Sequence, residues 1–90
     1  MSVLLITYDY TKTDPTIDQV PNIVKEYKHV QLSDGVFAIE THERTRTIFN
    51  KIFPFLSANV HLLVVTLIKP FSGPVRGPAS EWLAKHLPEA

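Results

Sequence analysis

Residues 2–13 read "SVLLITYDYTKT", an apolar segment that runs directly into a carboxylate at Asp9. β-Branched, aliphatic and aromatic residues fill positions 3–8, and the run is too short for a helix, so it predicts a strand. Both faces of this strand are apolar. The sequence leaves two interpretations of Asp9 open: a metal ligand at a strand end, or a solvated residue that begins a loop.

Apolar residues at helical spacing predict a helix after this strand. Asp14-Pro15 is typical of a cap followed by a proline in the first turn. Pro21 would cost about 3 kcal/mol or more inside a helix, so we expect the regular helix to begin near Val20 or to be kinked. The residues that share its apolar face are Ile17, Val20, Val24 and Tyr27.

A hairpin, a helix, a strand and a closing helix follow. Asp34-Gly35 is a strong turn signal between two β-prone segments. Thr41 is expected to cap the second helix, and Pro54 to end it or tighten its last turn. The expected apolar stripe of this helix consists of Ile48, Phe49, Ile52, Phe53 and Leu56. The remaining elements are predicted as a helix over residues 42–53, a strand over 60–68, a loop over 69–78 and a helix over 79–87.

The order β-α-β-β-α-β with an added C-terminal helix predicts one ferredoxin-like α+β domain over residues 1–90, with strand order 4-1-3-2. Its two crossover helices would cover one face of the sheet. Exposed apolar area costs about 25 cal/mol per Å², so the other face also needs a cover. Either the C-terminal helix, anchored by Trp82 and Leu83, or a second subunit could supply it. We favour a homodimer, either closed over the open sheet face or joined along an edge strand.

The composition limits the class of protein. The chain has 90 residues, no cysteine and a formal net charge of zero. Disulfides are therefore excluded, and a strongly basic nucleic-acid-binding surface is not expected, although a local basic patch is compatible with these numbers. No apolar run approaches the roughly 20 residues of a membrane span, and the first residues do not resemble a signal peptide. We expect a cytoplasmic protein that does not associate with membranes.

Four short motifs resemble one family. They are "LLITYD" in the first strand, "VFAIET" in the third, "LLVV" in the fourth and "SEWLAKHL" near the C-terminus. Together they are similar to the SinR-like group and to the related small subunit of the CRISPR spacer-adaptation complex, a family that includes CRISPR-associated endoribonuclease-like and VapD-related proteins. The resemblance implies a ferredoxin-like fold, a dimer, and an aspartate at the end of the first strand, here Asp9.

The resemblance also implies two functions of different kinds. One is a dimeric module of a CRISPR-associated or phage-defence type that binds nucleic acid or protein. The other is a weak metal-dependent endonuclease or toxin-like ribonuclease, in which Asp9 of each subunit holds Mg²⁺ or Mn²⁺. Only Glu40 could add a carboxylate from the third strand, and only Lys12 supplies a basic residue after "YD". We therefore favour the binding module.

The candidate site residues follow from these two functions. Asp9 is the catalytic and metal-ligating candidate. Aromatic and basic side chains stack on bases or neutralise phosphate, so they are the candidates for binding nucleic acid or a partner. These candidates are Tyr10, Lys12, Arg44, Arg46 and Arg76. For the arginines near residue 45, a solvated helix face is the simpler explanation.

Overall fold

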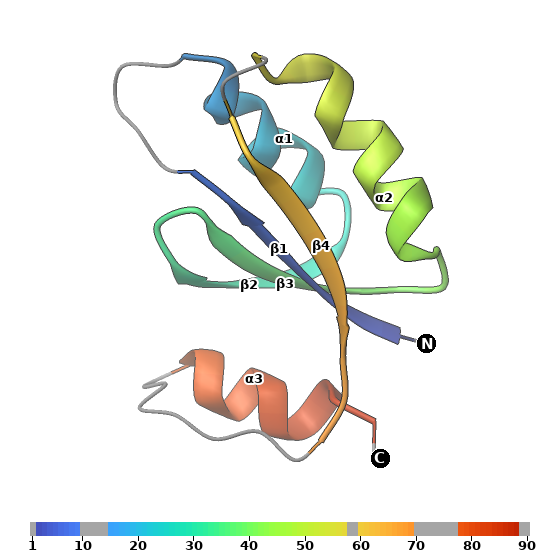
Figure 1. Ribbon diagram of the computed structural model, residues 1–90. Coiled ribbons are helices and arrows are strands. Elements are labelled where there is room, and N and C mark those ends of the chain that lie inside the picture. The colour runs from blue at the N-terminus through green and yellow to red at the C-terminus, as the bar shows by residue number, and fades with distance from the viewer. Residues whose placement is uncertain (1, 10–14, 58–59, 70–77, 89–90) are drawn as a thin grey trace.

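Four strands form one antiparallel sheet, with helices packed on both of its faces (Figure 1). The computed structural model describes residues 2–9, 15–57, 60–69 and 78–88. The strands are β1 (Ser2–Tyr8), β2 (Lys28–Ser33), β3 (Val36–Thr41) and β4 (Leu62–Leu67), in the order β2-β3-β1-β4. The helical segments are η1 (Pro15–Asp18), α1 (Gln19–Val24), α2 (Thr45–Ile52), η2 (Phe53–Phe55) and α3 (Pro78–His86). The predicted ferredoxin-like α+β fold and strand order are confirmed.

The first face of the sheet packs against α1 and α2. Alternate residues of a strand point to opposite faces, and on β1 the residues Leu4, Ile6 and Tyr8 point to this side. They are buried together with apolar side chains of the two helices and of β3. The helical and β3 members of this core are Ile17, Val20, Val24, Ile48, Ile52, Phe37 and Ile39.

The second face is covered in part by α3, which lies below the sheet in Figure 1. Leu83 of this helix and Leu87, which directly follows it, are buried against Val3 and Ala38 of the two central strands. Of the two covers that the sequence allowed for this face, the C-terminal helix and a second subunit, the helix therefore supplies at least a part. Trp82 packs against this cluster but is only partly buried.

The cover does not extend over the whole second face. Thr7 of β1 pairs with Leu63 of β4 on one side and with Val36 of β3 on the other. These three side chains form a row on the second face, near the C-terminal end of β1. Leu63 is 57% exposed, and its two neighbours are only partly buried. We call these three residues the open end of the second face.

The first helical region confirms the expected effect of Pro21. The chain forms the 3-10 turn η1 from Pro15, and α1 begins at Gln19. Pro21 thus lies in the first turn of α1, where a backbone N–H has no intrahelical acceptor in any case. Its missing N–H costs little there.

Two details of the second helix were predicted wrongly. Thr41 does not cap α2, because it is the last residue of β3 and its hydroxyl accepts the N–H of Glu43 at 3.0 Å. The helix begins only at Thr45, after Arg44, which makes no side-chain cap. Of the expected apolar stripe, Phe53 is 48% exposed, because Pro54 tightens the chain into η2 there.

Candidate functional site

Asp9 forms two hydrogen bonds with His61, the residue that directly precedes β4. Its backbone N–H donates to the carbonyl of His61 at 3.3 Å. In a regular antiparallel ladder, the N–H of His61 would return a bond to the carbonyl of Asp9. Instead it donates to the carboxylate, with 3.2 Å between His61 N and Asp9 Oδ2. The side chain therefore replaces a backbone acceptor where the two strands separate.

A shallow cavity of about 350 Å³ adjoins this carboxylate. Its lining consists of Thr7, Tyr8, Asp9, His61, Leu62 and Leu63. Asp9 is the one carboxylate among them, and the described residues contain no group of three or more metal-ligating side chains. Mg²⁺ usually takes one or two carboxylates besides water and phosphate oxygens. A site for Mg²⁺ or Mn²⁺ would thus need Asp9 of a second copy, and its role as a metal ligand stays a prediction.

The predicted binding residues do not gather around Asp9. Arg44 and Arg46 lie at the start of α2, over the first face, and both are exposed. Tyr10, Lys12 and Arg76 fall outside the residues that the structure describes. The described part of the chain therefore tests the position of two of these five residues, and it separates both from the aspartate cavity.

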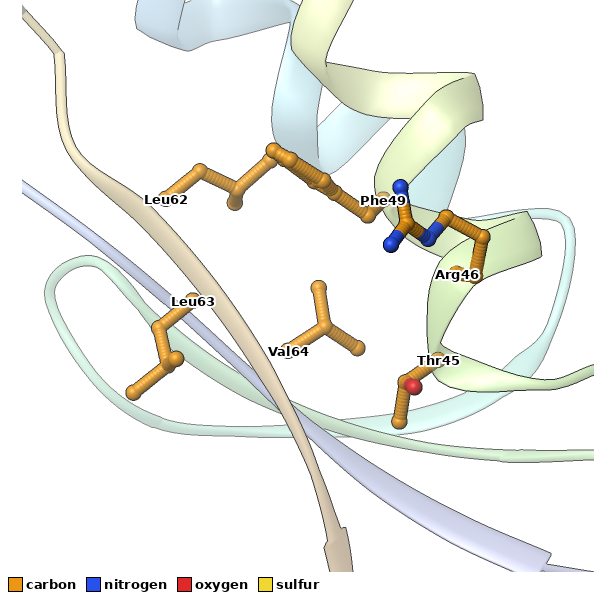
Figure 2. Close-up of a pocket in the computed structure, with 6 residues that line it drawn as sticks. All are labelled: Thr45, Arg46, Phe49, Leu62, Leu63 and Val64. Atoms are coloured by element: carbon orange, nitrogen blue, oxygen red, sulfur yellow. The ribbon is translucent and has the colours of Figure 1, made fainter.

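A second hollow lies between α2 and β4, and sequence reasoning missed it (Figure 2). It has a volume of about 290 Å³, and Figure 2 shows its lining, which consists of Thr45, Arg46, Phe49, Leu62, Leu63 and Val64. We call it the α2–β4 groove. The predicted strand order already placed β4 at a sheet edge, and Phe49 was in the expected apolar stripe. Joining the two observations would have indicated the groove.

A hydrogen-bonded cluster ties the segment after α1 to α2. The hydroxyl of Tyr27 donates to Glu43 at 2.7 Å, and Lys51 donates to the same hydroxyl at 2.8 Å. Lys51 also forms an ion pair with Glu43 at 2.8 Å. The hydrogen bond from Lys51 lowers the pKa of Glu43, and the same bond raises the pKa of Lys51. Burial also raises the pKa of Tyr27. Each of the three pKa values is thus shifted further from neutral pH, so none of these groups is suited to act as a general base or nucleophile there.

A second polar pair fixes α3 to the sheet. His86 Nδ1 lies 3.0 Å from Glu40 Oε2, and both side chains are largely buried. The ring of His86 packs against Trp82 at a tilt of 35°, with 4.4 Å between the ring centroids. Glu40, which the sequence offered as a possible additional ligand, thus pairs with α3 on the second face.

Comparisons with protein-family models, with curated proteins and with solved structures found no match. The resemblance to the CRISPR-adaptation family therefore rests on the four sequence motifs alone. None of the helices in the described ranges is long and apolar enough to cross a bilayer.

Proposed function

We propose that the protein is a small, non-catalytic binding module that acts as a homodimer and holds a nucleic-acid or protein partner. The observation that supports the dimer is the open end of the second face. Leu63 is 57% exposed there, between an end of the sheet and the part that α3 covers. Full burial of a leucine side chain contributes about 1.5–3 kcal/mol, and a symmetric contact would bury two.

The hydrogen bonding of Asp9 supports a binding role over catalysis. Phosphodiester cleavage needs a positioned nucleophile and neutralised phosphate charge, usually with several ligands. In one chain the carboxylate already accepts the His61 N–H, and no described basic side chain lines its cavity except the imidazole of His61. The resemblance in sequence is the reason to propose a CRISPR-associated or defence-related role in the cytoplasm.

Sedimentation velocity at micromolar concentration tests the dimer. We expect about twice the monomer mass of 10.2 kDa for the wild type and the monomer mass for Leu63→Ser. Phe55→Ser is the matched control, because Phe55 is 56% exposed but belongs to η2, which lies outside the sheet. A wild type that stays monomeric over the whole range, or a dimer that both variants retain, contradicts the proposed interface.

The partner class is tested by fluorescence anisotropy with labelled single- and double-stranded RNA and DNA. Any such binding should weaken as salt rises, because it depends on neutralising phosphates. Binding that Arg44→Gln and Arg46→Gln both reduce would support a nucleic-acid partner. No binding at low salt would leave a protein partner as the proposed function.

A further inference from the structure

The outer edge of β4 exposes backbone groups at known positions. The N–H of Asp9 bonds to His61 across β4, while the N–H of Tyr8 bonds to Gly35 across β3. Alternate residues of an antiparallel strand bond to opposite neighbours. The register then directs the backbone of Leu63, Val65 and Leu67 toward β1. The N–H and C=O groups of Leu62, Val64 and Thr66 therefore point outward, where no described strand pairs with them.

The two edges of the sheet differ in their protection. Proteins block free edges with charged residues, prolines or bulges, because an open edge pairs with other chains. β2 is "KHVQLS", begins with Lys28 and has a register shift between Gln31 and Ser33. β4 is "LLVVTL", with no charge, no proline and a continuous register against β1. The sequence thus leaves β4 as the edge that can accept another strand.

The α2–β4 groove lies beside this edge, on the side of the first face. Leu62 and Val64 point to that side and pack against the first-face core, whereas Leu63 points to the other side of the strand in Figure 2. In an antiparallel pair, side chains that lie directly opposite each other share a face. A residue paired with Val64 would consequently direct its side chain into the groove, toward Phe49.

Arg46 gives this groove a charge preference. It is exposed, its side chain lines the groove, and it forms no ion pair or hydrogen bond with any described side chain. A ligand that fills the groove removes water from the guanidinium, so binding is favoured when the ligand also supplies a carboxylate. Residues two apart in a strand share a face about 7 Å apart, which lets one strand fill the groove and reach Arg46.

We propose that the β4 edge and the α2–β4 groove bind an extended peptide of a partner protein as a fifth strand. Its apolar side chain occupies the groove, and a carboxylate two residues away pairs with Arg46. This rests on the proposed binding function but not on the dimer. Leu63 borders both sites, but its side chain, the proposed dimer contact, points to the opposite face of the strand from Val64. A second copy of β4 is a poorer occupant, because "LLVVTL" carries no carboxylate for Arg46.

The test uses fluorescein-labelled, threonine-rich peptides with leucine and glutamate two residues apart, titrated against the full chain by anisotropy. We expect saturable binding that weakens about tenfold or more when the glutamate becomes glutamine, the size expected for loss of one charge-assisted bond. Arg46→Gln should cause the same loss with the glutamate peptide and little further loss with the glutamine peptide. Lys85→Gln is the control, because it also removes a positive charge, and Lys85 is exposed on α3 and does not line the groove.

Strand addition is tested separately by N-methylation of the peptide. Methyl groups on the alternate amides that face β4 should abolish binding, whereas methyl groups on the other amides should leave it nearly unchanged. Thr66→Pro gives the converse test, because it removes an outward N–H of an exposed residue outside the groove. It should weaken binding about tenfold, with Thr66→Ala as control and circular dichroism as the check of folding.

Several results would overturn the proposal. They are absence of binding by every peptide, equal binding of the glutamate and glutamine peptides, and indifference to the pattern of N-methylation. Conversion of a wild-type dimer to a monomer by Thr66→Pro, with Leu63→Ser still dimeric, would assign the edge to a second copy. A monomeric wild type that binds the glutamate peptide would reject the proposed dimer and leave the peptide site standing.

Discussion

Leu83→Ala should loosen α3 from the sheet. Leu83 is 4% exposed and packs, with Leu87, on Val3 and Ala38. Leucine-to-alanine changes in cores cost about 2–5 kcal/mol, and a site under a single surface helix belongs near the lower end, because the helix can shift to fill the space. Alanine retains helix propensity, so the loss reports packing. A cost of about 2–3 kcal/mol corresponds to a fall in Tm of about 10–20 °C for a domain of this size.

Trp82 is the only tryptophan and lies on the same helix, so its emission reports whether α3 is docked. When Leu83→Ala is heated, we expect its Trp82 emission to shift to longer wavelength. This shift should occur at or below the temperature at which the circular dichroism signal of the fold is lost. Lys85→Ala, an exposed position on α3, is the control and should melt within about 2 °C of wild type. An unchanged Tm and unchanged emission for Leu83→Ala would refute the packing of α3 on the second face.

Three further predictions address other parts of the molecule. Because Lys51 holds the pKa of Glu43 below its usual value, their pairing stabilises the fold above about pH 4.5 and is lost as the pH falls through the lowered pKa; acid titrations of stability should be less steep for Glu43→Gln. Gly35 has φ of 76°, so Gly35→Ala should cost about 1–2 kcal/mol in urea unfolding, and a change under about 0.3 kcal/mol would contradict this. Purified protein with Mg²⁺ or Mn²⁺ should not cleave RNA or DNA, and cleavage that Asp9→Asn abolishes would favour the nuclease.

The fold could be predicted because its strongest signals are local. The β-prone segments, the Asp34-Gly35 turn and the helical periodicities each specify one element, and right-handed connections leave few ways to join them. The effect of Pro21 on the start of the first helix could be predicted for the same reason, since proline restricts the backbone wherever it occurs. Both depend on short-range sterics, which the sequence expresses directly.

The start of α2 depends on tertiary contacts and was therefore missed. Thr41 and a helical pattern from residue 42 are typical of a capped helix. In the structure, however, the pairing of β3 with β1 extends as far as Thr41, which lies opposite Ser2. The strand pairing retains Thr41 in the sheet, and its hydroxyl turns the chain at Glu43 instead. A residue that suits both a strand and a cap is assigned by its partners in the fold.

The same reasoning explains why the sequence left Asp9 ambiguous. A metal-ligating aspartate and a structural one both favour the point where a buried strand meets solvent, so the neighbouring residues look alike in the two cases. The structure adds an observation that these neighbours could not supply, because the N–H of His61, 52 positions away along the chain, donates to the carboxylate of Asp9. That bond fixes the approach of β4 to β1 at the end where the open face and the aspartate cavity meet. Loss of this bond should therefore also shift Leu63, which lies two residues after His61. The Asp9 carboxylate is thus linked to the proposed dimer contact through the structure, and this link does not require Asp9 to hold a metal.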